Sequence, residues 1–138
     1  MKLKVVLDEG AIMPTRAHET DAGLDLYAPC SLEIPVDGCG CIDTGVHVEI
    51  PKGYVGLMTS KSGLMRSGIT SRGTIDSGYT GSIGVILYNH CRYPYKIEKG
   101  QKVSQLVIVP IITPELEQVD SLEETERGSG GFGSTGKF

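Results

Sequence analysis

The stretches SIGVILYN, from Ser82 to Asn89, and KVSQLVIVPII, from Lys102 to Ile112, decide the fold class of this chain. Both are short runs rich in Val and Ile, bounded by turn-forming residues, which is the pattern of β-strands separated by turns. Shorter runs of the same kind precede them: KVVL around Val5, HVEI ending at Ile50 and YVGLM around Val55. This rhythm is typical of an all-β barrel or sandwich.

The composition of the 138 residues agrees with one small β domain. The chain has 19 Gly and 7 Pro, which disfavour long helices, and 39% hydrophobic residues, which suffice for one core. We expect one short helical turn after Ser62, capped by Ser62 and kept short by Gly63 and Gly68. The acidic stretch Glu115–Gly128 could form a helix, or a last strand with a polar lead-out; we favour a strand followed by an extended tail.

The net charge of −4 argues against a nucleic-acid binder and against a surface that docks on anionic membranes. Either function would need a clustered basic face. The N-terminus reaches Asp8 before any apolar run long enough for a signal peptide, and no segment approaches membrane-spanning length. We therefore expect a soluble cytoplasmic protein that meets any anionic ligand at a local site.

The cysteines and histidines give no sign of a metal centre or a nucleophile. The 4 cysteines form no C-x-x-C pair and have no downstream histidine at zinc-site spacing, so we interpret them as reduced, small apolar fillers. The 3 histidines are scattered, and we interpret them as ordinary surface or core residues. The residues concerned are Cys30, Cys39, Cys41, Cys91, His18, His47 and His90.

The last residues, RGSGGFGSTGKF, differ abruptly from the rest, so we divide the chain into a β domain, residues 1–126, and a Gly-rich segment, residues 127–138. The segment could be a flexible terminus, the common fate of such composition. It could instead close over a ligand, because freed backbone N–H groups form anion-binding nests and Ser134 and Thr135 can donate to phosphate oxygens. Arg127 can bind the same oxygens bidentately. Composition alone leaves these two interpretations about even.

Five short motifs follow one another along the chain: AGLDL at Ala22–Leu26, KSGL at Lys61–Leu64, GTIDSGYTG at Gly73–Gly81, GQKVSQL at Gly100–Leu106 and RGSGGFGSTG at Arg127–Gly136. Their order and spacing resemble those of the homotrimeric dUTP diphosphatase (dUTPase) family. The resemblance implies a jelly-roll-like β fold, a trimer with active sites shared between subunits, and Mg²⁺-dependent hydrolysis of dUTP to dUMP and pyrophosphate. Such an activity keeps uracil out of DNA and supplies dUMP for thymidylate synthesis.

The resemblance assigns the chemistry to the third motif. Asp76 would orient and deprotonate the water that attacks the α-phosphorus, and Tyr79 would lie against the deoxyribose, leaving no room for a 2′-hydroxyl. From the residues alone, Asp76 could equally be a turn aspartate and Tyr79 an aromatic at the core edge. We interpret the stretch Ile69–Ile75 as a small hairpin that receives the uracil. The residues expected to bind substrate there are Thr70, Gly73, Thr74 and Ile75.

The other motifs are expected, by the same resemblance, to bind the phosphates. Lys61 stands where family members often carry Arg; it keeps the charge but lacks the bidentate fork. The amides of Ser62 and Gly63, at a helix start, would hold the bridge between the α- and β-phosphates. Gln105 would contact a phosphate or a metal-bound water. The tail would contribute Arg127, Phe132, Gly133, Ser134 and Thr135, with the Phe132 ring stacked on the uracil.

The expected cofactor is Mg²⁺. Asp25 lies between Leu24 and Leu26, a pattern that places it on the opposite strand face from two core residues. The resemblance implies that Asp25 and Gln105 contact the ion through water while the substrate phosphates chelate it. Mg²⁺ commonly keeps several waters and borrows substrate oxygens in this way.

Two other functions compete with this hypothesis. A dCTP deaminase would share the fold, but the IDxxY arrangement at Ile75–Tyr79 and the complete Gly-rich fifth motif favour the diphosphatase. A non-catalytic regulator would use the same fold as a ligand-controlled protein-binding module. The presence of Asp76, Gln105, Arg127 and Phe132 together argues against lost catalysis, while a second binding role alongside catalysis stays open.

Overall fold

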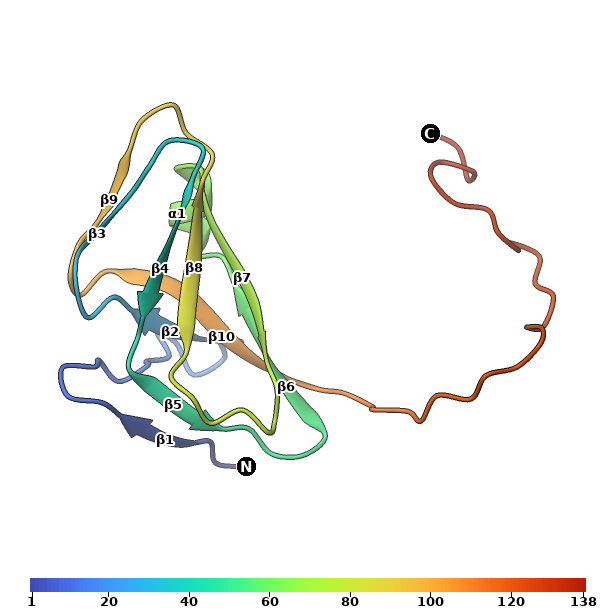
Figure 1. The fold of residues 1–138 in the computed structure, drawn as a ribbon, viewed down its shortest axis with the longest axis horizontal. Helices are drawn as coiled ribbons and strands as arrows, with labels where there is room; N and C mark the ends of the chain where they lie inside the picture. The colour runs from blue at the N-terminus through green and yellow to red at the C-terminus, as the bar shows by residue number, and fades with distance from the viewer.

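The computed structural model describes residues 1–138 and is mostly β, with one short helix (Figure 1). This confirms the expected fold class. The elements are β1 (Lys4–Leu7), β2 (Gly23–Tyr27), β3 (Leu32–Ile34), β4 (Cys39–Asp43), β5 (Val46–Glu49), β6 (Tyr54–Thr59), α1 (Ser62–Arg66), β7 (Ile69–Ile75), β8 (Gly84–Asn89), β9 (Tyr95–Ile97) and β10 (Lys102–Pro110). No helix has the length and apolar character needed to cross a membrane.

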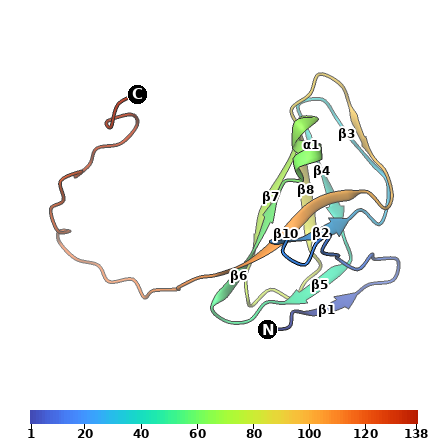
Figure 2. The same ribbon diagram turned by 180° about the vertical axis from the view of Figure 1, so that it is seen from behind.

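Six strands form one curled antiparallel sheet in the order β2-β10-β6-β7-β8-β4. Two two-stranded sheets, β1-β5 and β3-β9, close the open sides of the curl (Figures 1 and 2). Alternate residues of each strand point into the enclosed space; in β8, Val85 and Leu87 are buried while Ile86 and Tyr88 face out. The core is built from aliphatic side chains and contains no Phe, since both Phe residues lie in the exposed tail.

The runs of Val and Ile quoted above all form strands, as predicted. The hairpin expected at Ile69–Ile75 is wrong: the stretch is one continuous strand of 7 residues, β7. Its first half, Ile69–Ser71, pairs with β8 and its second half, Arg72–Ile75, pairs with β6, so the whole stretch is held extended by neighbouring strands. Gly73 is therefore not a turn residue; a Cβ there would collide with the Cε of Met58, so this flexible side chain would have to move.

The expected helical turn forms as α1, but its cap differs from the prediction. Ser62 is the first helical residue, and Lys61 occupies the N-cap position without any side-chain cap hydrogen bond. Gly68 follows the helix with φ of 81°, a left-handed conformation that Gly adopts without strain, and this ends the helix as expected.

The cysteines are not core fillers. All four are free thiols, and Cys30, Cys39 and Cys41 are exposed while Cys91 is half-buried. The filler interpretation is therefore wrong for the three exposed cysteines. Cys39 and Cys41 face outward because they alternate with Gly40 and the buried Ile42 on edge strand β4.

The chain leaves the body after β10. The last backbone hydrogen bond to the body runs from the Ile111 amide to the Gly53 carbonyl, at 2.9 Å. Residues 112–138 contain no helix and no strand, so the strand expected in the acidic stretch is not formed. Figures 1 and 2 show the segment extending away from the sheets, where no strand of its own chain lies beside it to pair with. Its aliphatic side chains are exposed, including Leu116 at 98%.

Candidate active site

Asp25 is the centre of the first group of predicted site residues. It pairs in register with Gln105 of β10, which in turn lies opposite Thr59 at the end of β6. Lys61, two residues beyond Thr59, places its Nζ 2.5 Å from Asp25 Oδ1. The Nζ of Lys102 lies 2.7 Å from Asp25 Oδ2. The sheet thus brings together the first, second and fourth motifs at one end of β6.

The two lysines determine the charge state of Asp25. Burial of the carboxyl, whose side chain is 6% exposed, would raise its pKa. The hydrogen bonds from Lys102 and Lys61 outweigh burial, so the pKa of Asp25 is lowered from its ordinary value. The same contact raises the pKa of Lys102. The cluster of two ammonium groups and one carboxylate therefore carries one net positive charge, which favours an anion.

The start of α1 borders this cluster. Because no side chain caps the helix, the amides of Ser62 and Gly63 are not engaged by a cap. Gln105 is half-buried beside them and its Nε2 reaches the Ser60 carbonyl at 3.5 Å. Gly23 leaves room for this side chain, since a Cβ there would lie 2.5 Å from Gln105 Oε1 and the Gln105 side chain would have to shift.

A second group lies around the end of β7. A hollow of about 260 Å³ is lined by five of the predicted site residues of the third motif and its strand. These residues are Gly73, Thr74, Ile75, Asp76 and Tyr79. The Tyr79 hydroxyl donates to the Ser82 carbonyl at 2.8 Å, and Gly81 leaves the room that the ring needs. Asp76 is exposed at the rim.

Thr70 does not belong to this hollow. It lines a separate pocket near Ser60, where its hydroxyl lies 2.8 Å from Nε2 of His90. Thr70 and Gly73 are therefore not parts of one hairpin, since β7 holds them three residues apart in an extended strand; their binding of uracil stays a prediction.

The tail forms a third group, remote from both others. Arg127, Ser134 and Thr135 line one open hollow within the tail, and the Nε of Arg127 donates to the Gly130 carbonyl at 2.9 Å. Phe132 is fully exposed. Figures 1 and 2 show this segment well away from the body, so a single chain does not bring the tail to either of the other groups.

The protein itself offers few ligands for a cation. No three Cys, His, Asp or Glu side chains gather closely enough to hold a metal ion. Of the two residues predicted to contact Mg²⁺, Asp25 is already bonded to two lysines and Gln105 to a backbone carbonyl. A resident, fully protein-held Mg²⁺ does not fit this donor set, whereas an ion that arrives on phosphate oxygens fits it.

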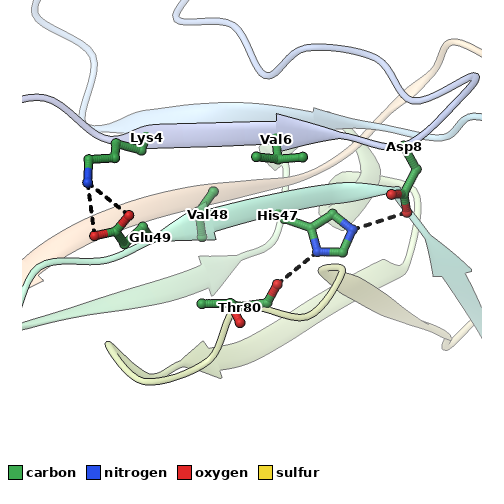
Figure 3. A pocket seen from close by; sticks show the side chains of 7 residues that line it. All are labelled: Lys4, Val6, Asp8, His47, Val48, Glu49 and Thr80. Atoms are coloured by element: carbon green, nitrogen blue, oxygen red, sulfur yellow. Dashed lines mark hydrogen bonds and ion pairs between the residues drawn. The ribbon is translucent and has the colours of Figure 1, made fainter.

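Sequence reasoning missed two residues near these groups. Lys102 was not singled out, although it lies in the fourth motif; its contact with Asp25 depends on the pairing of β10 with β2, which places Lys102 opposite Tyr27. His47 was interpreted as ordinary, yet its ring lies between Asp8 and the Thr80 carbonyl in the loop that carries Tyr79 (Figure 3). Nothing in the local sequence indicates that contact, because it joins residues far apart in the chain.

Comparison with known proteins identifies the family. A family model described as dUTPase matches residues 9–136, which include all five motifs. The chain belongs to the dUTPase family. The expectation that it is an enzyme of this class is confirmed by relatives that carry the name deoxyuridine 5′-triphosphate nucleotidohydrolase. The one from Gloeothece citriformis is 47% identical over 99% of this chain and 97% of its own, and that from Solanum lycopersicum is 39% identical over 94% and 78%.

Solved dUTPase structures show the same fold. The Staphylococcus bacteriophage 80alpha dUTPase with dUPNHPP superimposes with a TM-score of 0.91 at 38% identity, covering 98% of each chain. The dUTPase from phage phi11 of S. aureus gives a TM-score of 0.84 at 36% identity, covering 91% of this chain and 100% of its own. The curled sheet described above is thus the dUTPase fold.

Proposed function

We propose that this dUTPase family member hydrolyses dUTP to dUMP and pyrophosphate, as a homotrimer whose active sites are each assembled from several subunits. The observation that carries the proposal is the separation of the site residues into three groups within one chain. The phosphate-binding group at Lys61, the group at Asp76 and the tail around Phe132 lie apart. Symmetric association of copies is the simplest way to bring the three together.

The group around Asp25 and Lys61 is proposed to receive the triphosphate. Its net positive charge attracts the anion, and the amides of Ser62 and Gly63, which no side chain caps, are available as donors. Lys61 can neutralise phosphate charge as a point cation. Gln105 lies in the same row of the sheet and supplies an amide group to a phosphate or to a water of its metal ion.

The group at the end of β7 is proposed to carry out the reaction. Asp76 would orient the attacking water and take its proton, which needs an exposed carboxylate beside a pocket of nucleoside size. Tyr79 forms a wall of that pocket and would exclude a 2′-hydroxyl. The base would lie against Gly73, Thr74 and Ile75, where backbone groups can match the polar edge of uracil and reject cytosine.

Mg²⁺ is proposed to arrive with the substrate, held by its phosphates, with Asp25 and Gln105 contacting it through water. When bound, the ion would help to neutralise charge on the departing pyrophosphate. One similar structure, of a mutant of the phage phi11 dUTPase, is described with a structural Mg(II) ion. The small number of protein ligands around Asp25 supports an ion held by the substrate rather than one held by the protein alone.

The tail is proposed to be a lid rather than a mere flexible terminus. The open hollow between Arg127, Ser134 and Thr135 offers a guanidinium and two hydroxyls to a γ-phosphate. Gly133 has φ of 92°, a conformation that lets the segment turn back beside Phe132. Phe132 is left free to stack on the uracil and exclude water as the tail closes.

One assay tests the proposal against its competitors. Pyrophosphate release is measured with dUTP, dTTP, dCTP and UTP, each with and without Mg²⁺. Release from dUTP alone, dependent on Mg²⁺, is expected. Ammonia release from dCTP would instead support a deaminase, and Mg²⁺-dependent binding of dUTP without pyrophosphate release would support a non-catalytic regulator.

A further inference from the structure

The loop between β7 and β8 carries Asp76 and Tyr79 but has no regular structure of its own. Its C-terminal end is fixed to the body. The Ile83 amide donates to the Val46 carbonyl at 2.9 Å, the Thr44 hydroxyl donates to the Ile83 carbonyl at 2.7 Å, and the Ser82 hydroxyl donates to Asp43. These contacts leave the middle of the loop, residues 77–81, to be held by something else.

One side chain supplies that contact. The Nδ1 of His47, on β5, lies 2.8 Å from the Thr80 carbonyl oxygen, and no other hydrogen bond of residues 77–81 leaves the loop. The Nε2 of the same ring lies 3.1 Å from Asp8 Oδ2. Figure 3 shows the ring spanning the gap between these two oxygens. The pairing of β1 with β5 sets this geometry, because Val6 opposite His47 brings Asp8 to the ring.

Both partners of the ring are acceptors. A carbonyl oxygen and a carboxylate cannot donate, and a neutral imidazole has only one N–H. The protonated ring has two, so only the imidazolium satisfies Thr80 and Asp8 together. The hydrogen bond to Thr80 first, and then that to Asp8, raise the pKa of His47, and the nearby carboxylate of Asp43 adds to the effect.

The His47 ring, Asp8 and Thr80 line a hollow at the surface of β5, and the other charged groups around it do not compete for the ring. Lys4 of β1 and Glu49 of β5 line the same hollow but pair with each other at 3.1 Å. Asp43, at the end of β4, is engaged by the Ser82 hydroxyl and the Gly45 amide, which lower its pKa and keep it ionised. The charges that face His47 are therefore negative.

We propose that His47 is a positioning residue for the hydrolysis: as an imidazolium anchored on Asp8 it holds the Thr80 carbonyl, and thereby orients Asp76 and Tyr79. This inference rests on the proposed function. The hold is complete below the pKa of His47 and is lost as the pH rises through it, because the neutral ring has a single N–H, and the Asp8 carboxylate, a stronger acceptor than the Thr80 carbonyl, takes it. The pH profile of kcat is then expected to have an alkaline limb, a fall in kcat as the pH rises. This limb follows the titration of His47 and not that of a group in contact with the nucleotide.

Three variants of the full-length protein test it, with kcat and KM for dUTP measured from pH 6 to 10. His47→Gln cannot bridge both oxygens, and a displaced loop is expected to lower kcat by about tenfold, with a much smaller change in KM, and to abolish the limb. Asp8→Asn keeps an acceptor but removes the charge that raises the pKa of His47, so the alkaline limb is expected to move to lower pH. Lys4→Gln breaks the neighbouring Lys4–Glu49 pair and is expected to leave the profile unchanged.

Two readouts do not need activity. The His47 ring titration, followed by NMR, is expected to share its midpoint with the limb of the wild type and to move with it in Asp8→Asn. Amide hydrogen exchange of residues 77–82 at one pH is expected to speed up in His47→Gln and not in Lys4→Gln. If the ring titration moves in Asp8→Asn while the kcat profile stays, or if exchange of the loop is unaffected in His47→Gln, the positioning role is overturned. Absence of dUTP hydrolysis in the wild type would overturn the proposed function instead, with the exchange result still readable.

Discussion

Lys61 and Asp76 lie at opposite ends of the same antiparallel pair of strands. Lys61 follows the C-terminal end of β6 and Asp76 follows that of β7. Thr59 is opposite Arg72 and Gly56 is opposite Ile75, so the two residues are offset by about six strand positions, or roughly 20 Å. If Lys61 holds the phosphates and Asp76 activates the water, as proposed, this separation implies that the two residues of one active site come from different chains.

Mixed assemblies test this directly. Lys61→Ala and Asp76→Asn are each expected to be nearly inactive as pure proteins. Co-refolded in equal amounts, they are expected to recover about a quarter of wild-type activity, because about one site in four combines an intact Lys61 from one subunit with an intact Asp76 from another. Pyrophosphate release after mixing is the measurement. Activity no higher than that of the separate variants would mean that each site lies within one chain.

Asp76→Asn is expected to keep nucleotide binding and lose most turnover. The amide preserves shape but cannot accept the proton of the attacking water, and loss of a general base typically costs about 10²–10⁴-fold. Calorimetric titration with a non-hydrolysable dUTP analogue, beside the kcat measurement, separates the two effects. Near-normal kcat would show that another group activates the water.

Removal of residues 127–138 is expected to leave a folded protein with little activity. The tail makes no hydrogen bond to the body, so circular dichroism is expected to be unchanged. The lost lid is expected to reduce kcat/KM for dUTP by at least about tenfold. Unfolding of the truncated protein would instead assign the tail to the fold, and full activity would leave it as a flexible terminus.

Tyr79→Ala is expected to narrow the preference for dUTP over UTP. The ring fills the space beside the hollow at the end of β7, and its removal opens room for a 2′-hydroxyl. The ratio of kcat/KM for dUTP and UTP measures the effect, with Tyr88→Ala, on the outward face of β8, as a matched control. An unchanged ratio would remove Tyr79 from sugar selection.

Asp25→Asn is expected to destabilise the protein at neutral pH by about 1–3 kcal/mol, because two lysines lose their shared counter-charge while remaining partly exposed. The lowered pKa of Asp25 means that its contribution is present above the ordinary value of 3.8 and is lost as the pH falls through the lower, folded value. Urea unfolding of wild type and variant at a fixed protein concentration, at pH 7 and near pH 3, is expected to show a difference that shrinks in acid.

The exposed Glu33→Gln on β3 removes a carboxylate without an ion pair and serves as the control. An Asp25→Asn variant as stable as this control at pH 7 would show that the lysine cluster contributes nothing to the fold.

The strands rich in Val and Ile could be predicted because local pattern and burial coincide in them, as β8 illustrates. The short strands β3, β4 and β9 were not predicted, because Cys, Gly and Lys have weak preferences for the β conformation. Whether these residues form strands is decided by their pairing with strands distant in the sequence. The stretch Ile69–Ile75 is the same case: Gly73 resembles a turn residue, but its pairing with Met58 of β6 keeps it in an extended strand.

The residue types of the site could be recognised from five motifs, but their grouping could not. Asp25, Lys61 and Lys102 meet because β2, β10 and β6 are neighbours, an order that no local sequence specifies. The contact of His47 with Thr80 depends likewise on how β5 lies against a loop 33 positions away in the chain. The pairing of strands far apart in the chain depends on the packing of the whole core, so short motifs do not predict it.

The long segment after β10 would make the proposed lid a tethered ligand. From Pro110 to Arg127 the chain can span at most about 60 Å, which would keep Phe132 within reach of a neighbouring subunit of the proposed trimer at a high local concentration, whatever the protein concentration in solution. Closure of the lid would then depend on the length of the segment between Pro110 and Arg127 more than on the affinity of the lid for the nucleotide. If this segment is shortened residue by residue, closure is expected to be lost abruptly, at the length where the segment no longer reaches the neighbouring active site.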